Sequence, residues 1–463
     1  MKLRTGLLLG AAFATGLVAG PFLREVGPAL RISAAHAEDA APGEHQDAYH
    51  LLTLFGTVFE KVRSDYVEPV KDQDLIENSL NGMLSGLDPH SSYMNAKQWG
   101  DMQIQTKGAF GGLGLEVTED RDNGLIKVIS PIDDTPAQRA GLKAGDLILS
   151  LDGKSVEGLT LNDAVDRMRG APGTPVTLSI TREHVDKPIE VNLTRELIHI
   201  QVVKSALYGD VGYIRLSSFN EESDPKLRAA IDKLKAESHG SLRGLVFDLR
   251  NDPGGLLDQA VDVCEDFIAD GEIVSTRARH PEDSNRWDAK GTDLIDGLPL
   301  VVLINGGSAS ASEIVAGALQ DHRRAIVLGT RSFGKGSVQT VYPVGNDGAI
   351  RLTTARYYTP SGRSIQGLGI APDVEVAESR EEEVHFLPDR EADLNHALKN
   401  EGASAPTKKA APRDDIPVQA KDIPSKPPAN WPKFDLANPQ TDFQLQQGIA
   451  LVKDMAQQRH AAR

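Results

Sequence analysis

Two amphipathic helical segments open the regularly patterned part of the chain. In HQDAYHLLTLFGTVFEKVRSD, residues 45–65, apolar side chains recur three or four positions apart from Leu51 to Val62. This spacing predicts a helix with one apolar stripe. A second helical segment, DLIENSLNGMLSGL, ends at LDPHSSYM, where a proline and a polar cluster interrupt the pattern. We interpret the lone histidine of this turn, His90, as structural.

Residues 108–196 have a different pattern, made of short β runs. FGGLGLEV, LIKVISPI, GDLILSLDGK and PVTLSITR read as strands, and turns rich in Gly, Pro and Asp separate them. One helix, TLNDAVDRMRG, carries its apolar residues on one face and begins behind an N-cap at Thr160. The pattern predicts a β-rich domain with a single well-formed helix.

From about residue 197 to 377, strands and helices alternate, as in an α/β sheet. GLVFDLRND, LPLVVLIN and RAIVLGT are almost continuously apolar, which is typical of buried parallel strands. LDQAVDVCEDFIAD and ASEIVAGALQDH between them have helical spacing. Residues 378–430 are charged and then rich in Ala, Pro and Lys, which indicates a linker or a disordered segment. Helical periodicity returns in DFQLQQGIALVKDMAQQ, within residues 431–463.

Composition narrows the classes of function. The chain has 463 residues, 40% apolar and 25% charged, as expected of a soluble protein with two or three domains. Its net charge of −16 argues against nucleic acid as a partner. Cys264 is the one cysteine, so neither an intrachain disulfide nor a cysteine-based metal site can form. Its helical context favours a buried apolar role over a reactive thiol.

The N-terminus, residues 1–37, has the features of an export signal. MKLR supplies positive charge, GLLLGAAFATGLVAG is an apolar run, and SAAHA ends at Ala37 as a cleavage candidate. The apolar run has only about 15 residues, short for a membrane span. The stretch between Gly20 and Ala37 is long for a cleavage region and carries charges, so an uncleaved inner-membrane anchor stays open. Both alternatives place the rest of the chain in the periplasm or cell envelope.

Residues 329–340, GTRSFGKGSVQT, nearly match a phosphate-binding P-loop. Gly336 stands where the magnesium-binding hydroxyl should be, and the following SVQTVYPV reads as a strand rather than the required helix. An ATPase is therefore disfavoured. A Ser-His-Asp hydrolase is also disfavoured, because the chain lacks a G-x-S-x-G elbow and His322 falls at the wrong edge of the expected sheet.

The lengths of three consecutive elements bring Lys335 to a serine-rich turn. A strand ends near Asn305, a helix runs from near Ala311 to near His322, and a strand over 324–329 runs back a similar distance. The loop with Lys335 should then face SASAS at the carboxyl ends of the strands, where sites of open α/β sheets form. FDLRNDPGG should bring free backbone N–H groups to the same edge. A hydroxyl, an amine and amides are the parts of a Ser-Lys hydrolase.

Such an enzyme needs a neutral lysine, although free lysine titrates near ~10.4. Burial without a carboxylate partner lowers that pKa, and GTRSFGKGSVQT contains no acidic residue. Gly334 and Gly336 let the backbone close around Lys335. Gln339, four residues on, offers a neutral amide that can orient the amine without fixing its charge.

Three serines compete for the role of nucleophile. Ser308 lies in the glycine turn, Ser312 inside the first helical turn, and Ser310 at the strand-to-helix corner, where a helix N-terminus favours developing negative charge. Ser310 and Glu313 also form a capping-box pattern. On spacing alone, N-capping therefore remains an alternative explanation of Ser310.

Several motifs together resemble the carboxyl-terminal processing proteases, a PDZ-containing family of Ser-Lys serine peptidases. They are NGGSASASEIVAGAL, GTRSFGKGSVQ, LDPHSSYM, GGLGLEV, FDLRNDPGG and TTARYYTPSGRSIQGLGIAPD, and the resemblance covers roughly residues 48–377. It implies Ser310 as nucleophile, Lys335 as general base and Gln339 as its support. The long Ala/Pro/Lys-rich tail is less typical of the family.

The resemblance also implies two sets of backbone donors. The oxyanion hole would use the amide of Gly254 or Gly255, between which the sequence does not choose, together with that of Ala311. In the PDZ domain, Leu113, Gly114 and Leu115 would offer amides to the carboxylate of a substrate C-terminus, and the substrate would pair with the adjacent strand. A tight turn without a ligand is the alternative for that loop.

The implied fold is α/β: a crotonase-like protease core with an inserted, β-rich PDZ domain and helical N- and C-terminal segments. We divide the chain into a signal or anchor (1–37), an N-terminal helical region with the start of the protease cap (38–107), the PDZ domain (108–196), the Ser-Lys core (197–377), a linker (378–430) and a C-terminal helical segment (431–463).

The implied activity is that of an exported serine endopeptidase without cofactor or metal. It would recognise the C-terminal tails of protein or peptide substrates and process or degrade envelope proteins. The helical ends of such enzymes imply a homo-oligomer, and the need for an adaptor protein stays open. The alternative is a catalytically inactive PDZ scaffold that binds protein C-termini.

Overall fold

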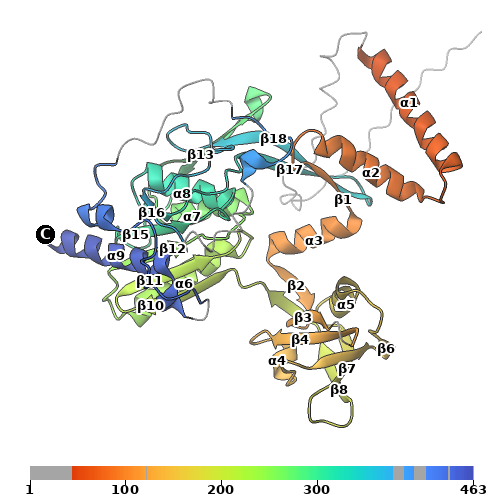
Figure 1. Cartoon of the computed structure of the whole chain (residues 1–463), viewed down its shortest axis with the longest axis horizontal. Helices are drawn as coiled ribbons and strands as arrows, with labels where there is room; N and C mark the ends of the chain where they lie inside the picture. The colour runs from red at the N-terminus through yellow and green to blue at the C-terminus, as the bar shows by residue number, and fades with distance from the viewer. Residues whose placement is uncertain (1–43, 121–122, 379–389, 401–412, 436–437, 462–463) are drawn as a thin grey trace, which may run out of the picture. The chain divides into compact units, whose positions relative to one another are not determined.

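A computed structural model gives the architecture of the chain (Figure 1). The structure describes residues 44–120, 123–378, 390–400, 413–435 and 438–461. The signal expected over residues 1–37 lies outside them. Among the described residues, none of the helices has both the length and the apolar character needed to cross a membrane. The chain divides into two units, up to Leu75 and from Ile76 onward.

The first unit contains the predicted amphipathic helix, α1 (Glu44–Asp65). Intrahelical pairs such as Arg63 with Glu60, at 3.2 Å, support its polar side. Its apolar side chains are exposed, among them Leu51 and Phe55, at 60% and 46%. The next helix, α2 (Asp72–Ser85), begins in the first unit and ends in the second.

Within the second unit, the β-rich region forms an antiparallel sheet in the order β3-β4-β5-β7-β8, with β6 paired to β5. The core of this region consists of side chains such as Ile126, Ile148 and Leu178 together with Ala164 of α5. The predicted cap is present, because the Asp163 amide donates to the Thr160 hydroxyl at 3.2 Å. The elements are β3 (Leu115–Asp120), β4 (Leu125–Pro131), α4 (Pro136–Arg139), β5 (Leu147–Leu151), β6 (Lys154–Ser155), α5 (Leu161–Met168), β7 (Pro175–Thr181) and β8 (Ile189–Thr194).

A short two-stranded ribbon connects this region to the rest of the unit. β2 (Ala109–Gly112) pairs antiparallel with β9 (Glu196–His199), and α3 (Ala96–Lys107) precedes β2. Helix α3 ends at Gly108, whose φ of +67° is left-handed. A side chain at Gly108 would also collide with Asn220, since its Cβ would lie 2.6 Å from that amide.

The α/β region is built on a six-stranded sheet in the order β10-β11-β12-β15-β16-β19. Only β10 and β11 are antiparallel; the other neighbours are parallel. Strands β12 and β15 are buried at every position, as their continuous apolar runs predict. The strands are β10 (Val203–Tyr208), β11 (Val211–Leu216), β12 (Gly244–Asp248), β15 (Leu300–Ile304), β16 (Ile326–Gly329) and β19 (Val374–Glu375).

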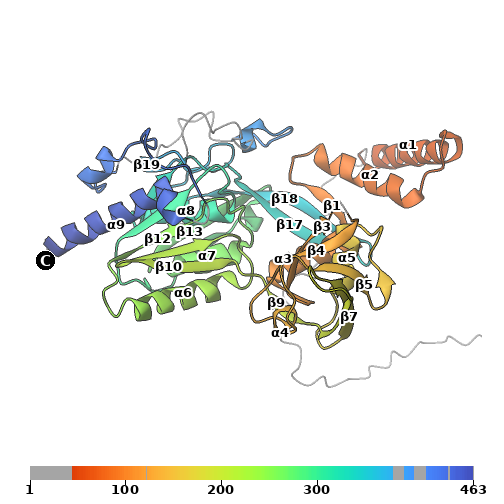
Figure 2. The same cartoon turned by 60° about the horizontal axis from the view of Figure 1, so that its bottom comes forward.

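Helices cover both faces of this sheet (Figure 2). On one face α6 (Ser223–Glu237), α7 (Leu257–Glu265) and α8 (Ala311–Asp321) share a core with Phe247 and Val302. On the other face α9 (Phe443–Ala461) packs on Val246, Val301 and Leu303. Helix α8 is buried from Ala311 to Gln320, and apart from Glu313 and Gln320 its buried residues are apolar or small.

A second sheet has the order β1-β18-β13-β14, and β17 pairs with β18 outside this path. Its long central strand β18 pairs with β1 over its first part and with β13 over its last part. The strands are β1 (Ser92–Asn95), β13 (Gly271–Ala278), β14 (Arg286–Ala289), β17 (Ser337–Pro343) and β18 (Gly348–Tyr358). Short 3₁₀ turns occur at η2 (Pro281–Asp283), η4 (Glu391–Asp393), η6 (Val418–Asp422) and η7 (Pro439–Thr441).

The stretch interpreted as a linker contains packed residues. Ala420 is buried in the core under α9, and Ile416 and Ile423 pack against that core. The amide of Ala377 donates to the carbonyl oxygen of Ser425 at 2.8 Å. Glu391 is fully buried. The Ala, Pro and Lys composition hides these anchors, because single apolar residues without periodicity leave no pattern to read.

Candidate active site

Ser310 lies at the corner between β15 and α8 in a backbone conformation that is rare for residues other than glycine. Its φ is +55° and ψ is −112°, outside the usual regions for an L-residue. The residue is only 8% exposed, so surrounding contacts hold it in place. Backbone strain of this kind concentrates at functional sites.

The hydroxyls of the other two serines of the motif, Ser308 and Ser312, form hydrogen bonds that stabilise this corner. The Ser308 hydroxyl donates to the Leu249 carbonyl oxygen at 2.8 Å, and the Ser312 hydroxyl donates to the Asp252 carbonyl oxygen at 3.0 Å. The Glu313 amide bonds the Ser310 carbonyl oxygen at 2.9 Å, and the Ser310 hydroxyl donates no hydrogen bond to any of the described residues. Of the three, Ser310 is therefore the serine whose hydroxyl proton has no acceptor among the described residues.

Glu313 joins the serine corner to the lysine loop. Its Oε2 accepts the amide of Ser310 at 2.8 Å and the amide of Lys335 at 2.9 Å. Its Oε1 accepts the amide of Gly334 at 2.7 Å and the hydroxyl of Ser332 at 2.5 Å. Because one oxygen bonds both amides, the backbones of Ser310 and Lys335 lie no farther apart than those two bonds together. The fold thus brings together the two residues that the sequence predicted to meet.

Burial raises the pKa of Glu313 to about 7, although these four hydrogen bonds act in the opposite direction. The sequence pattern identified Glu313 only as part of a capping box. Its contact with the lysine loop was missed, because no local pattern encodes a partner 19 to 22 positions away.

Lys335 lies in the loop before β17 and is partly buried. Its pKa is lowered, chiefly by burial and then by the charge of Arg351, while Glu391, Glu313 and Asp88 raise it by smaller amounts. Within the described parts of the chain, no carboxylate forms an ion pair with its amine. A neutral amine is therefore accessible at lower pH than for a free lysine.

Gln339 lies on β17 opposite Thr353 of β18, at the point where the register of the two strands shifts. Its amide nitrogen donates to the Ser337 hydroxyl at 2.9 Å and to the Thr353 hydroxyl at 3.2 Å. The Thr353 hydroxyl in turn donates to Asp88 Oδ1 at 3.0 Å. The turn LDPHSSYM therefore reaches the surroundings of Gln339, a role that the sequence analysis did not assign.

The glycine turn after β12 lies directly against Ser310. Gly254 has a φ of +93°, and a Cβ there would lie 2.6 Å from the Ala309 carbonyl oxygen, 2.8 Å from the Ala311 amide nitrogen and 2.9 Å from the Ser310 Cβ. The Gly254 amide donates to Asp252 Oδ1 at 2.8 Å. Burial raises the pKa of that carboxyl to about 8.

Gly255 and Ala311 present their amides differently. Gly255 forms a parallel bridge with Phe219 in which the neighbouring Gly254 carbonyl and Leu256 amide make the bonds. The Gly255 N–H therefore points away from Phe219. Ala311 is the first residue of α8, where an amide has no acceptor within the helix.

A network behind the lysine loop includes the histidine of the LDPHSSYM turn. His90 Nε2 and Glu391 Oε2 are 2.7 Å apart, and Gln366 Nε2 donates to Glu391 Oε1 at 2.7 Å. Gln366 Oε1 accepts the amide of Gly336 at 3.0 Å. His90 therefore supports the loop that carries Lys335, as its interpretation as a structural residue requires.

The loop expected to bind a substrate C-terminus precedes the first strand of the β-rich region. Leu113 is buried, and its carbonyl oxygen accepts the Ala137 amide at 3.0 Å. Gly114 has a φ of +76°, and a Cβ there would lie 2.2 Å from Thr135. Leu115 begins β3, which pairs only with β4 in the described sheet. The other edge of β3 is thus unpaired.

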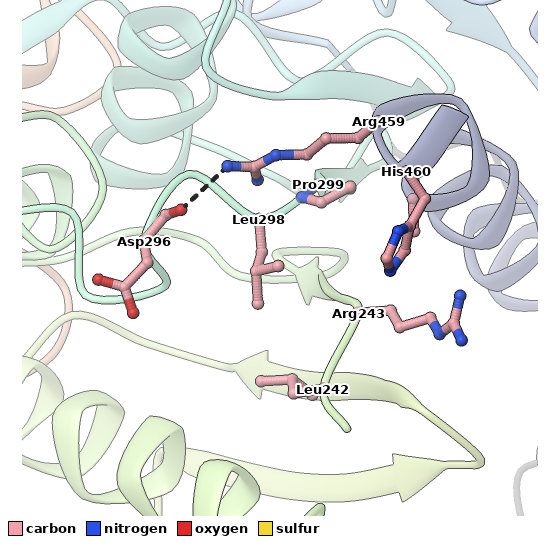
Figure 3. Close-up of a pocket in the computed structure, with 8 residues that line it drawn as sticks. Leu242, Arg243, Asp296, Leu298, Pro299, Arg459 and His460 are labelled. Carbon is pink, nitrogen blue, oxygen red and sulfur yellow. Dashed lines mark hydrogen bonds between the residues drawn. The ribbon is translucent and has the colours of Figure 1, made fainter. Parts of the chain in front are cut away.

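Two features that resemble sites lie elsewhere. A cavity of about 300 Å³ is lined by residues that precede β12 and β15, including Arg243 and Pro299, at the amino ends of these strands. There Arg459 points toward the backbone of Asp296 (Figure 3). His322, at the far end of α8, lies 2.6 Å from the Glu272 carbonyl oxygen. Neither the cavity nor His322 is at the carboxyl edge where Ser310 lies.

The similarity of this chain to known proteins identifies the family to which it belongs. A model of peptidase family S41 matches residues 210–376, a PDZ domain model matches residues 101–181, and a model of the N-terminal domain of the activating protease CtpB matches residues 26–98. A carboxy-terminal-processing protease of Bartonella bacilliformis is 57% identical over 341 residues, which are 73% of this chain and 78% of that protein. The chain belongs to peptidase family S41, among its carboxy-terminal-processing proteases.

Two more distant proteins are also named as C-terminal processing proteases. A carboxyl-terminal-processing protease of Synechocystis sp. is 36% identical over 68% of this chain and 74% of that protein. The solved photosystem II D1 C-terminal processing protease is 29% identical, covers 70% of this chain and 92% of its own, and has a TM-score of 0.40. The family models and the relative that is 57% identical show that the chain is a serine-type peptidase with an S41 protease fold and a PDZ domain.

Proposed function

We propose that this S41 peptidase hydrolyses peptide bonds with Ser310 as nucleophile and Lys335 as general base. The observation that carries the proposal is the single oxygen of Glu313 that bonds the backbones of both residues. The lowered pKa of Lys335 supports it, because only an uncharged amine can accept the serine proton. Ser308 and Ser312 are engaged in fastening the corner.

The mechanism follows from these roles. The Ser310 hydroxyl oxygen attacks the carbonyl carbon of the scissile bond while its proton passes to the amine of Lys335. The resulting ammonium protonates the leaving nitrogen, and the C–N bond breaks to leave an ester on Ser310. Water then attacks the ester, with Lys335 again accepting the proton and returning it to the serine oxygen.

The developing oxyanion needs two amide donors. We propose Gly255 and Ala311, because the Gly254 amide is engaged by Asp252 and would be released only if that bond opened. Ala311 also stands at the N-terminus of α8, where the helix dipole favours negative charge. Gln339 would hold the amine of Lys335 in place without a charge of its own.

The PDZ domain would capture the C-terminal tail of the substrate. The unpaired edge of β3 can accept an extended peptide as an added strand, and the loop Leu113–Gly114–Leu115 lies at its start. The export-like N-terminus supports a location in the periplasm or cell envelope, with tails of envelope proteins as substrates. The exposed apolar side chains of α1 support self-association through the N-terminal region.

A degradation assay tests the dyad. The purified full chain should cleave an unstructured protein such as casein, whereas the Ser310→Ala and Lys335→Ala variants should lose at least about a thousandfold in rate while they remain folded. Circular dichroism and thermal unfolding would confirm the fold of each variant. Cleavage by Ser310→Ala at the rate of the unaltered protein would refute the assignment and revive the inactive-scaffold alternative.

A further inference from the structure

The hydrogen bonds around Gln339 have a fixed direction. Asp88 is buried, and burial by itself would raise the pKa of its carboxyl. The hydroxyls of Ser91 and Thr353 and the amides of His90 and Ser91 more than offset this, so that the pKa is lowered overall. Asp88 is therefore a carboxylate, which can only accept hydrogen bonds.

The hydroxyl of Thr353 has one proton, and it donates this proton in a hydrogen bond to the carboxylate of Asp88. Thr353 Oγ1 lies 3.0 Å from Asp88 Oδ1. The nearby Ser91 hydroxyl donates to Asp88 Oδ2 at 2.6 Å and lies 3.5 Å from Thr353 Oγ1, so it also directs its proton to the carboxylate. The lone pairs of Thr353 Oγ1 remain, and a neighbour bonded to them must be a donor.

That neighbour is the side-chain amide of Gln339. The amide nitrogen is the only donor of this group, and it lies 3.2 Å from Thr353 Oγ1. Its second proton goes to the Ser337 hydroxyl at 2.9 Å. Both amide protons are thereby used, and the amide oxygen is the part of Gln339 that remains to bond an amine.

The register shift between Val338 and Gln339 makes this chain possible. Val338 pairs with Ala355, but Gln339 pairs with Thr353, so the strand β18 contributes one extra residue, Thr354. A β-bulge of this kind re-aims side chains next to active sites. Without the shift, Gln339 would lie opposite Thr354, whose hydroxyl bonds that of Thr340 at 2.7 Å.

We propose that Thr353, oriented by the carboxylate of Asp88, is a positioning residue that fixes the amide of Gln339 with its oxygen toward the amine of Lys335. The inference rests on the proposed Ser310–Lys335 dyad and on Gln339 as its support. It assigns to the LDPHSSYM turn a part in catalysis that acts through two intermediate side chains and touches no substrate.

Substitution of Thr353 by Val, which has the same shape but no hydroxyl, tests the proposal. The expected result is a fall in kcat of about tenfold, a fraction of what positioned proton transfer contributes, with KM unchanged. Thr353→Ser, which keeps the hydroxyl, should restore kcat. Thr354→Val is the matched control: it removes a neighbouring hydroxyl bond on the same strands and should leave kcat unchanged. Titration of active sites with a serine-directed phosphonate corrects every kcat for unfolded protein.

The pH profile adds a readout that loss of stability would not move. An amide oxygen beside the amine favours the ammonium form of Lys335. In Thr353→Val the Gln339 oxygen is no longer held toward the amine, so the pKa of Lys335 should fall. The acidic limb of kcat/KM should then shift to lower pH. The charged groups that act on Lys335 are Arg351 of β18, Glu391 of η4, Glu313 of α8 and Asp88 before β1. All four are retained in Thr353→Val and Thr353→Ser, so a difference between these variants reports the hydroxyl.

A double-mutant cycle decides whether Thr353 acts through Gln339. In a Gln339→Ala background, Thr353→Val should have no further effect on kcat. The proposal is overturned if Thr353→Val keeps the kcat of the unaltered protein, if Thr354→Val lowers kcat as much, or if the two losses multiply in the double variant. Failure of the proposed Ser310–Lys335 dyad gives a different result, because peptidase activity would then survive in Lys335→Ala.

Discussion

At the scale of single residues, Glu313 has two functions in one carboxylate. It accepts the amide at the start of its own helix and three donors from the loop of residues 332–335. The capping-box pattern predicts the first function, because partners three residues apart are a local feature. The second depends on two segments that meet only in the folded chain, and the sequence around Glu313 contains no sign of it.

The choice among three serines shows the same limit. Spacing alone left Ser308, Ser310 and Ser312 open, with N-capping as a further explanation of Ser310. The carbonyl oxygens that engage Ser308 and Ser312 belong to Leu249 and Asp252, about 60 residues earlier in the chain. Long-range acceptors of this kind require the fold, whereas the sequence itself shows that the stretch GTRSFGKGSVQT around Lys335 contains no acidic residue.

A residue-scale prediction concerns Gly254. Replacement by Ala would place a methyl group 2.6 Å from the Ala309 carbonyl oxygen and 2.9 Å from the Ser310 Cβ, so the serine corner must shift. A displacement of about 1 Å at a reacting group costs about 100-fold in rate. We expect Gly254→Ala to lower kcat by at least that factor in the casein assay.

The control for this variant is Gly240→Ala. Gly240 also has a positive φ, +79°, but a Cβ there would meet no atom within 4 Å. It reproduces the backbone strain of the substitution without the collision at Ser310. Equal losses of kcat in the two variants would show that strain alone, and not the position of the serine corner, explains the effect.

At the scale of elements, the unit formed by β15, α8 and β16 follows from the sequence almost completely. The helix expected from near Ala311 to near His322 runs over Ala311–Asp321, and the returning strand runs over Ile326–Gly329. Length matching succeeds here because a buried helix and its flanking strands must span the same sheet. The bulge on β18 could not be predicted, because a shift of one residue leaves the β pattern of both strands intact.

An element-scale prediction concerns the unpaired edge of β3. A peptide captured there as an added strand, with its terminal carboxylate in the loop before β3, should depend on that carboxylate. We expect a fluorescent peptide with a free C-terminus to bind the full-length Ser310→Ala protein at least about tenfold more tightly than its C-terminally amidated twin. Fluorescence anisotropy measures both affinities. Equal binding of the two peptides would contradict capture through the terminus.

At the scale of the whole molecule, a buried ion network ties the C-terminal segment to the central sheet. The Arg250 guanidinium bonds Asp248 at 2.9 and 2.7 Å and Asp442 at 2.9 and 2.7 Å. The Tyr213 hydroxyl donates to Asp248 at 2.8 Å. Burial by itself would raise the pKa of Asp248, but Arg250 outweighs it and the pKa is lowered. The family motif FDLRNDPGG contains Asp248 and Arg250, whereas Asp442 lies in the C-terminal segment 431–463, outside residues 48–377 that the family resemblance covers.

A whole-molecule prediction follows for Arg250→Met. Removal of the guanidinium takes from the buried carboxylate of Asp248 the cation that bonds it and should cost about 3–5 kcal/mol in the free energy of unfolding at pH 7. The stability that Arg250 gives through Asp248 is present above the pKa of an unfolded Asp and is lost as pH falls through the lowered folded pKa. The difference from the unaltered protein should therefore narrow in acid. Urea unfolding followed by tryptophan fluorescence measures the difference in the free energy of unfolding at pH 7 and in acid.

Arg243→Met is the matched control for this prediction. Arg243 pairs with Asp210 at 2.9 Å, but both side chains are about one-third to one-half exposed. Its replacement should cost no more than about 1 kcal/mol, as for other exposed ion pairs. Similar losses for Arg250→Met and Arg243→Met would mean that the buried network does not anchor the C-terminal segment.

Cleavage by the proposed dyad depends most directly on an uncharged Lys335 that activates Ser310. The rate at which a serine-directed phosphonate labels the protein, measured as a function of pH, reports this activation. We predict that the label is found on Ser310, that the rate falls in acid with a midpoint below the ~10.4 of free lysine, and that Lys335→Ala is not labelled. Labelling of Lys335→Ala at the rate of the unaltered protein, or a midpoint at the value of free lysine, would contradict it.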